Sequence, residues 1–183
     1  MSRPQEPEPT LLVAGLLHGP DFPLDQLLPR LEARFGPVGE VSEALAFDQT
    51  DYYVREMGPG LLRRLVMFER LVDPGRLPEI KLATNAIEDE LRGEQGFRRV
   101  NVDPGLLSAA NFILATGKGY THRPYLGSGI YADLTLLWSR GGFVKLPWTY
   151  PDYAGEALQM VLTRFRGQYL NKLRAWRETG RDA

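Results

Sequence analysis

The sequence predicts a single α+β domain with a mixed or antiparallel sheet. Over the first hundred residues the hydrophobic patterns follow the order strand, helix, strand, strand, helix, strand, which is the βαββαβ order of a ferredoxin-like unit. Three further strands and a C-terminal amphipathic helix extend this order. No helical pattern interrupts residues 97–147, and this continuity disfavours an alternating, doubly wound fold.

The first elements follow from short apolar runs. Residues 11–17 are apolar throughout and end before the turn residues Gly19 and Pro20, which predicts a strand buried on both faces. Helical spacing then covers residues 23–35, where Pro29 predicts a kink. The pattern predicts these further elements: strands over 41–48 and 61–71, a helix over 78–91, a strand over 97–102, a turn at 103–105 and a strand over 112–115.

The C-terminal part carries the clearest patterns. Apolar and polar residues alternate over 130–136, and turn residues at 139–142 lead into a second strand at 143–147, which predicts a β-hairpin. From 154 to 176 apolar residues recur every three or four positions. They predict a long helix packed across one face of the sheet, with Asp152 near its N-cap.

Length and composition agree with one globular domain. The 183 residues are 43% hydrophobic and 25% charged, which is ordinary for a soluble protein. Residues 1–9 are acidic and rich in proline and predict a flexible tail, so that residues 10–183 form the domain. No apolar run approaches the roughly 20 residues that span a bilayer, and residues 1–9 lack the pattern of a secretory signal. We therefore expect a cytoplasmic protein without a membrane partner.

Charge and cysteine content exclude several classes of function. Lys and Arg total 22 against 23 Asp and Glu, a net charge of -1, so no global field favours a nucleic-acid partner. The chain has no cysteine, which excludes disulfides, zinc–thiolate sites, iron–sulfur clusters and thiol catalysis. Its imidazole groups are those of His18 and His122.

A basic, glycine-rich loop follows the strand predicted at 112–115. Two glycines flank Lys118, and His122 and Arg123 follow within six residues. Close backbone approach and cationic donors suit a phosphate or a carboxylate. The spacing does not match a P-loop, and a solvated basic loop is the alternative. His122 could act as an acid or base oriented by Asp133, or it could be a structural loop histidine.

Two other segments suggest function. Residues 48–58 collect three carboxylates, including Glu56, and two tyrosines. Such carboxylates could hold Mg²⁺ or transfer protons, although a solvated loop is the alternative. Residues 120–153 contain five of the eight tyrosines, which is typical of a core or of a homo-oligomer interface. We expect residues 148–153 to fold back over the loop at 118–123.

Several long strings are specific enough to suggest a family: TDYYxxEMG (50–58), IKLATNxIE (80–88), RVNVDPG (99–105), LATGKxYxHRxYL (114–126), GIYADLTL (129–136) and WTYPDY (148–153). Together they resemble the bacterial domain of unknown function family 4416 over nearly the whole chain after the tail. The resemblance implies no particular activity, cofactor or partner. It implies that the polar residues in these strings are characteristic of the family, and a hydrophobic core does not need them.

We therefore expect the polar residues of these strings to converge on one cleft that binds a small anionic ligand. Catalytic roles are expected for His122, Asp133 and Glu56, with Glu56, Glu88 or Asp133 supplying the acid, the base or a Mg²⁺ ligand. The residues expected to bind the ligand are Lys118, Arg123, Tyr53, Lys81, Asn85, Glu88, Asn101 and Asp103.

The function that these residues suggest is a small-molecule enzyme. A hydrolase or transferase would act on a phosphorylated or nucleotide-like metabolite through the basic glycine-rich loop. Two alternatives stay open. The same cleft could belong to a non-catalytic ligand-binding module, or the protein could be an oligomeric scaffold whose polar strings form buried hydrogen-bond networks.

Overall fold

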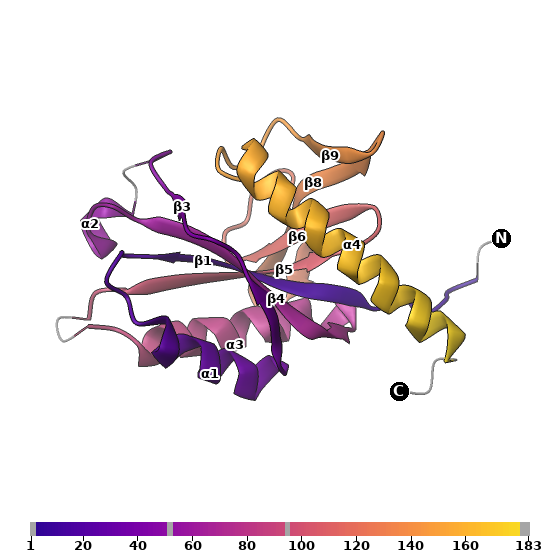
Figure 1. Ribbon diagram of the computed structural model, residues 1–183, viewed down its shortest axis with the longest axis horizontal. Coiled ribbons are helices and arrows are strands. Elements are labelled where there is room, and N and C mark those ends of the chain that lie inside the picture. Colours follow the sequence, from indigo (N-terminus) through magenta and orange to yellow (C-terminus); the bar gives the residue numbers. More distant parts are fainter. Residues whose placement is uncertain (1–2, 51–52, 94–95, 180–183) are drawn as a thin grey trace.

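A nine-stranded antiparallel sheet lies between helices in the computed structural model, which describes residues 3–50, 53–93 and 96–179 (Figure 1). The strands are β1 (Thr10–His18), β2 (Val38–Val41), β3 (Leu45–Ala46), β4 (Leu62–Val72), β5 (Val100–Leu107), β6 (Asn111–Thr116), β7 (Tyr125–Gly127), β8 (Ile130–Ser139) and β9 (Gly142–Lys145). The helices are α1 (Leu24–Phe35), α2 (Val54–Met57), the short 3₁₀ helix η1 (Pro74–Arg76), α3 (Leu77–Glu90) and α4 (Glu156–Glu178).

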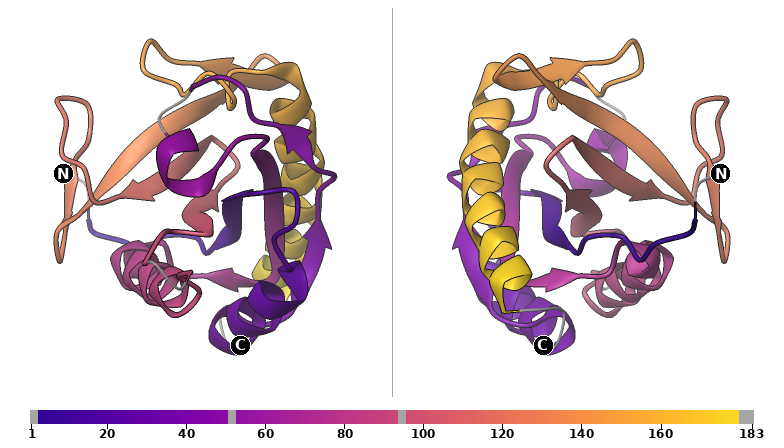
Figure 2. Two further views of the ribbon diagram at one scale, coloured as in Figure 1. Left: turned by 90° about the vertical axis from the view of Figure 1, so that its left-hand side faces the viewer. Right: turned by 90° about the vertical axis from the view of Figure 1, so that its right-hand side faces the viewer.

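The strand order is β2-β4-β1-β5-β6-β8-β7, with β3 paired to β4 and β9 paired to β8. Helices α1 and α3 cover one face of the sheet, and α4 crosses the other face (Figure 2). Strand β1 lies between β4 and β5, and all nine of its residues are buried. Its residues alternate between the two cores, since Leu11 and Val13 pack in the α4 layer while Leu12 and Ala14 pack against α1 and α3. Burial on both faces explains its uninterrupted apolar sequence.

The α+β class and the antiparallel sheet are confirmed. So are the predicted strands that correspond to β1, β4, β6, β8 and β9, and the helices that correspond to α1, α3 and α4. The ferredoxin-like order is not confirmed, because the short elements β3 and α2 stand between β2 and β4. The strand expected at 41–48 is broken, because the backbone N–H and side-chain oxygen of Ser42 both bond to Leu65 of β4 between β2 and β3.

The turn predicted at Asp103–Gly105 is wrong, because these residues lie inside β5 and pair with β1. Gly105 lets β5 pass close to β6 because it has no side chain. The ring of Phe112 on β6 lies so near that a Cβ added to Gly105 would come within 2.7 Å of it. The predicted N-cap is also wrong, since α4 begins at Glu156 after Gly155, and Asp152 is bound elsewhere.

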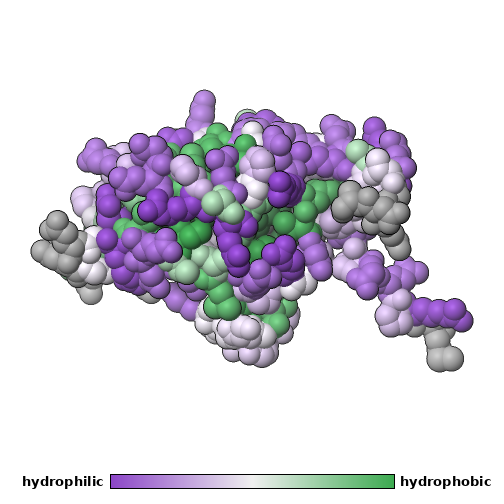
Figure 3. All heavy atoms as spheres, turned by 90° about the horizontal axis from the view of Figure 1, so that it is seen from below, coloured by the Kyte–Doolittle hydropathy of each residue, from purple (hydrophilic) through white to green (hydrophobic). Residues whose placement is uncertain are grey.

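The outer surface agrees with amphipathic helices. Figure 3 views the side of the molecule on which α1 and α3 lie, and hydrophilic side chains cover most of it. At the other face, the Tyr169 hydroxyl of α4 donates a hydrogen bond to the carbonyl of Pro9, which ties the start of β1 to this helix. Among the described residues, none of the helices combines the length and the apolar composition that a membrane span requires.

We predict that Gly105→Ala destabilises the fold. The new Cβ would lie 2.8 Å from the backbone oxygen of Ile113, which cannot move without shifting β6. Overpacking of this kind costs about 1–3 kcal/mol, measurable by urea unfolding. Gly142→Ala in β9 is the control, because its Cβ would meet no atom within 4 Å. Equal stability of the two variants would contradict the prediction.

Candidate functional site

The sheet opens between β5 and β6. Strand β5 pairs with β1 along its whole length, from Val100 to Leu107, but with β6 only from Gly105 to Leu107. Before Gly105 the two strands diverge, and among the described residues no strand pairs with that edge of β5. Pro104 lies at this point and has no N–H to leave unpaired.

Two side chains of α3 bond to the open edge of β5. The carboxylate of Glu88 accepts a hydrogen bond from the Val102 N–H at 2.8 Å. The ammonium group of Lys81 donates to the Val102 carbonyl at 3.0 Å and to Asp103 at 3.3 Å. Two turns of helix separate Lys81 from Glu88, so both lie on the same helix face. These buried charges therefore satisfy backbone groups that a paired strand would otherwise satisfy.

A pocket of about 700 Å³ lies at this opening. One wall comes from α2, α3 and β5, and the other from the end of β6, from β8 and from the segment after β9. Its charged lining residues are Arg63, Lys81, Arg98, Lys118, Glu56, Glu88, Asp103, Asp133 and Asp152. The pocket thus presents charges of both signs.

A buried arginine lies beneath the pocket. Arg63 of β4 has a side chain only 6% exposed, and its Nε donates to Asp152 at 2.9 Å. Its Nη1 lies 4.0 Å from Asp103, and its guanidinium packs over the rings of Phe47 and Tyr153. This network joins β4, β5 and the segment that precedes α4.

Gly15 of β1 makes room for this network. A Cβ at Gly15 would lie 2.3 Å from the Tyr153 hydroxyl oxygen and 3.5 Å from Arg63 Nη1. A glycine inside a central strand usually marks such a close approach. The Tyr153 hydroxyl is fully buried, and burial raises the pKa of Tyr153 far above its usual value.

Glu88 is a carboxyl group of the pocket lining whose pKa is strongly raised. Burial raises the pKa of Glu88 to about 7, and the opposing effects of Lys81 and of the Val102 N–H are smaller. Arg98 lies 3.6 Å from Glu88 and 3.6 Å from Glu56, so it connects the two carboxylates. Burial also raises the pKa of Tyr53 to about 12. Glu88 can therefore exchange a proton near neutral pH.

A second cluster joins the basic loop to β8. Asp133 is 1% exposed, and its Oδ2 accepts a hydrogen bond from Arg123 Nε at 2.8 Å. The same guanidinium donates to the Lys118 carbonyl and to the Tyr150 hydroxyl. His122 Nε2 lies 3.6 Å from Asp133 Oδ2, and its ring stacks on Trp148. The segment 148–153 therefore folds back over the loop at 118–123, as predicted.

Most of the predicted site residues line the pocket. Those that do are Tyr53, Glu56, Lys81, Asn85, Glu88, Asn101, Asp103, Lys118 and Asp133. His122 and Arg123 lie behind Asp133 and are not in the lining. Because its Nε, Nη1 and Nη2 all donate to protein oxygens, Arg123 holds Asp133 in place.

Sequence reasoning missed Arg63, Arg98 and the roles of Asp152 and Tyr153. Arg63 occupies an inward-facing position of β4, since Leu65 and Met67 on the same face belong to the α4 core. A charged residue in such a pattern was the available signal. Its partners on β5 and after β9 could not be inferred without the strand register.

Four buried polar atoms in the pocket lining have no hydrogen-bond partner among the described residues. They are Arg63 Nη1, Arg98 Nε, Asp133 Oδ1 and Tyr153 Oη. Buried polar groups are usually hydrogen-bonded, and such exceptions often mark functional sites. In the part of the chain that the structure describes, no three His, Asp or Glu side chains form a group that could hold a metal ion. Asp51, one of the carboxylates predicted near Glu56, lies outside the described residues.

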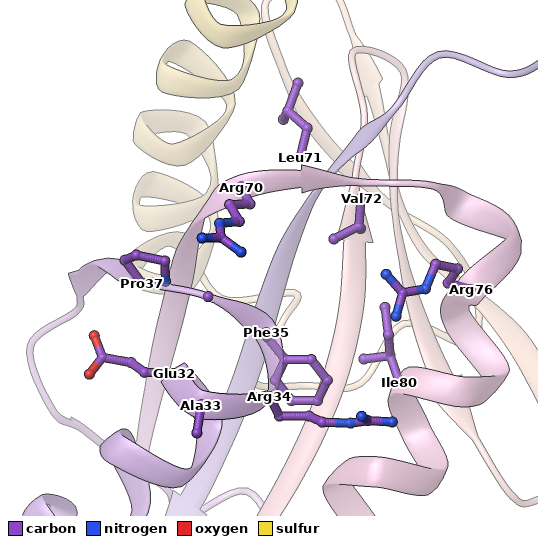
Figure 4. A pocket seen from close by; sticks show the side chains of 11 residues that line it. Glu32, Ala33, Arg34, Phe35, Pro37, Arg70, Leu71, Val72, Arg76 and Ile80 are labelled. Carbon is purple, nitrogen blue, oxygen red and sulfur yellow. The ribbon is translucent and has the colours of Figure 1, made fainter. Parts of the chain in front are cut away.

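A second cavity of about 640 Å³ lies at the end of α1. Figure 4 shows Arg34, Arg70 and Arg76 around it, together with Phe35 and Ile80. Arg34 and Arg76 both bind Glu79 and are half exposed. None of the predicted site residues lines this cavity, so the pocket between β5 and β6 is the candidate site.

One comparison with known protein families found a match. A family model described as "Domain of unknown function (DUF4416)" matches residues 8–169. No curated protein and no solved structure matches the chain.

The raised pKa of Glu88 predicts a specific pH dependence of stability. Between about pH 4.5 and 7, the folded protein keeps a proton that the unfolded chain releases. The free energy of unfolding should therefore fall as the pH rises through this window. Glu88→Gln should remove up to about 3 kcal/mol of this dependence. Urea unfolding of both proteins from pH 4.5 to 8 measures it, and parallel profiles would refute it.

A second prediction concerns Gly15. Gly15→Ala should destabilise the protein by about 1–3 kcal/mol, because the new methyl group collides with the Tyr153 hydroxyl. Tyr153→Phe removes the colliding oxygen, so Gly15→Ala should cost less in that background. A double-mutant cycle of urea unfolding gives the coupling. Additive effects would show that the two residues do not interact.

Proposed function

The chain belongs to the DUF4416 family, a domain of unknown function, and from the pocket between β5 and β6 we propose that it is a small-molecule enzyme. The proposed reaction is a hydrolysis or group transfer on a phosphorylated or nucleotide-like metabolite. A pocket of about 700 Å³ is within the range that encloses a metabolite of this size.

The proposal depends on one observation, which is the raised pKa of the buried Glu88 carboxyl group in the pocket wall. A general acid or base works best when its pKa lies near the working pH, and burial raises the pKa of Glu88 to about 7. Its carboxylate is anchored by the Val102 N–H at 2.8 Å and lies in the pocket wall. Glu88 would therefore take or give the proton in the reaction, and the nearby Glu56 would share the contact with Arg98.

The anionic part of the ligand fits the cationic groups at the pocket. The side chain of Arg98 is 28% exposed and lies between two carboxylates, so a phosphate could reach it from the pocket. On the opposite wall Gly117 and Lys118 follow the end of β6. The Lys118 N–H already donates to the Thr116 hydroxyl at 3.1 Å, so the ammonium group of Lys118 would contact the phosphate as a cation. Asn85 adds an amide on the α3 wall.

The mixed charge of the lining argues against a ligand that is only anionic. Glu56, Glu88, Asp103, Asp133 and Asp152 stand against four cations, so a bare polyanion would meet repulsion as well as attraction. A metabolite that joins a phosphate to a sugar or base can direct hydroxyl or amino groups at these carboxylates. This balance supports a nucleotide-like or sugar-phosphate ligand.

A thermal-shift screen tests the proposal. The purified protein is screened against nucleotides, sugar phosphates, organic acids and divalent ions. A ligand at 100 times its Kd should add about 2.7 kcal/mol of stability, and each hit is then assayed for turnover. Lys118→Ala should weaken binding of a phosphorylated hit, whereas Arg70→Ala, in the second cavity, is the control and should not.

Glu88→Gln separates catalysis from binding. The amide can still accept the hydrogen bond from Val102, so the variant should bind the hit but lose at least 100-fold in kcat, as expected for a missing general acid or base. Full turnover by this variant would remove Glu88 from the mechanism. Binding without turnover by the native protein would indicate a ligand-binding module, and no hit would reject the pocket as a metabolite site.

A further inference from the structure

Asp133 belongs to the pocket lining and carries a buried acceptor that lacks a partner in the described part of the chain. Its side chain is 1% exposed, and its two oxygens differ. Oδ2 faces Arg123 and His122, whereas Oδ1 has no hydrogen-bond partner among the described residues. A buried carboxylate oxygen without a donor is costly, so this position favours a ligand that brings one.

The contacts of Arg123 and His122 determine which oxygen of Asp133 has no hydrogen-bond partner within the described structure. Arg123 binds Oδ2 through Nε, and its other nitrogens are held by the Lys118 carbonyl and the Tyr150 hydroxyl. The His122 ring, stacked on Trp148, approaches the same Oδ2. The contacts that Asp133 makes with Arg123 and His122 both involve Oδ2. Arg123 is thus a positioning residue that holds Oδ2 and leaves Oδ1 as the acceptor without a donor among the described residues.

We infer that Asp133 is a specificity-determining residue, whose Oδ1 accepts a hydrogen bond from an amino or hydroxyl group of the ligand. This inference rests on the proposed function and narrows its substrate class to phosphorylated metabolites with such a donor. The basic loop then has a different role from the one that its sequence suggests. Of the cationic residues in this loop, Lys118 would bind the anion, whereas Arg123 orients the carboxylate of Asp133.

Matched sugar phosphates test the inference. Glucosamine 6-phosphate, glucose 6-phosphate and 2-deoxyglucose 6-phosphate carry an amine, a hydroxyl or no donor at one carbon. AMP and purine riboside 5′-monophosphate differ in the same way at the base. In at least one series, the Kd of a member with the donor at the varied position should be at least tenfold lower than that of the member that lacks it there. The arms of the sugar series separate an amine from a hydroxyl.

Asp133→Asn provides the residue-specific test. The amide oxygen can accept from Arg123, and the NH₂ group then puts a donor where Oδ1 was an acceptor. The donor preference should fall below twofold or reverse. Glu79→Gln removes a half-exposed carboxylate outside the pocket and should keep the preference, which separates a specific acceptor from a general effect of charge.

The outcomes separate the two proposals. If the probes bind but every series shows affinities within twofold, the inference about Asp133 is wrong and the proposed function stands. If Asp133→Asn keeps the full preference, another group recognises the donor. If Asp133→Asn does not fold, equal affinities within every series measured on the native protein still overturn the inference. If no probe binds, the proposed function fails and this inference fails with it.

Discussion

A buried guanidinium holds the candidate site together. Arg63 extends from β4 across Gly15 and meets Asp152 and Asp103, which lie far apart in the sequence. Taking an arginine out of water is costly, and its two carboxylates together with the rings of Phe47 and Tyr153 offset that cost. If one carboxylate were lost, the buried charge would be compensated only in part. The position of the segment between β9 and α4, and hence one pocket wall, depends on this contact.

The divergence of β5 and β6 is the second constraint. A sheet that opens leaves backbone groups without partners, and here Lys81 and Glu88 of α3 bond to both polar groups of Val102. The groups that complete the fold are therefore the groups that give the pocket its charge. Stability and chemistry cannot be separated along this face of α3, because a change at Lys81 or Glu88 affects both.

The hydrophobic pattern of neighbouring residues was enough to predict β1, β8 and α4. The apolar run of β1, the alternation in β8 and the spacing in α4 each reflect burial that the neighbouring residues share. The prediction failed at Asp103–Gly105, where the signal of Pro104 and Gly105 for a turn is overridden by pairing with β1. It failed again at Asp152, which binds Arg63 on a distant strand and so does not cap α4.

The site was predicted in composition but not in arrangement. The polar strings named most of the lining residues, yet they could not reveal that Arg123 is bound to Asp133 or that His122 stacks on Trp148 behind it. Those relations depend on how β8 and the segment after β9 meet in space. Arg63 was missed for the same reason, because its partners lie on β5 and on the segment that precedes α4, far from it in the sequence.

The bond between Val102 and Glu88 gives this protein a built-in reporter. In most strands a backbone amide bonds to a carbonyl, whose charge does not change, but the Val102 amide bonds to a carboxylate whose pKa burial raises to about 7. Its proton resonance and its rate of hydrogen exchange therefore depend on the charge of Glu88. A single backbone NMR signal would follow both the titration of this acid and the arrival of a ligand beside it.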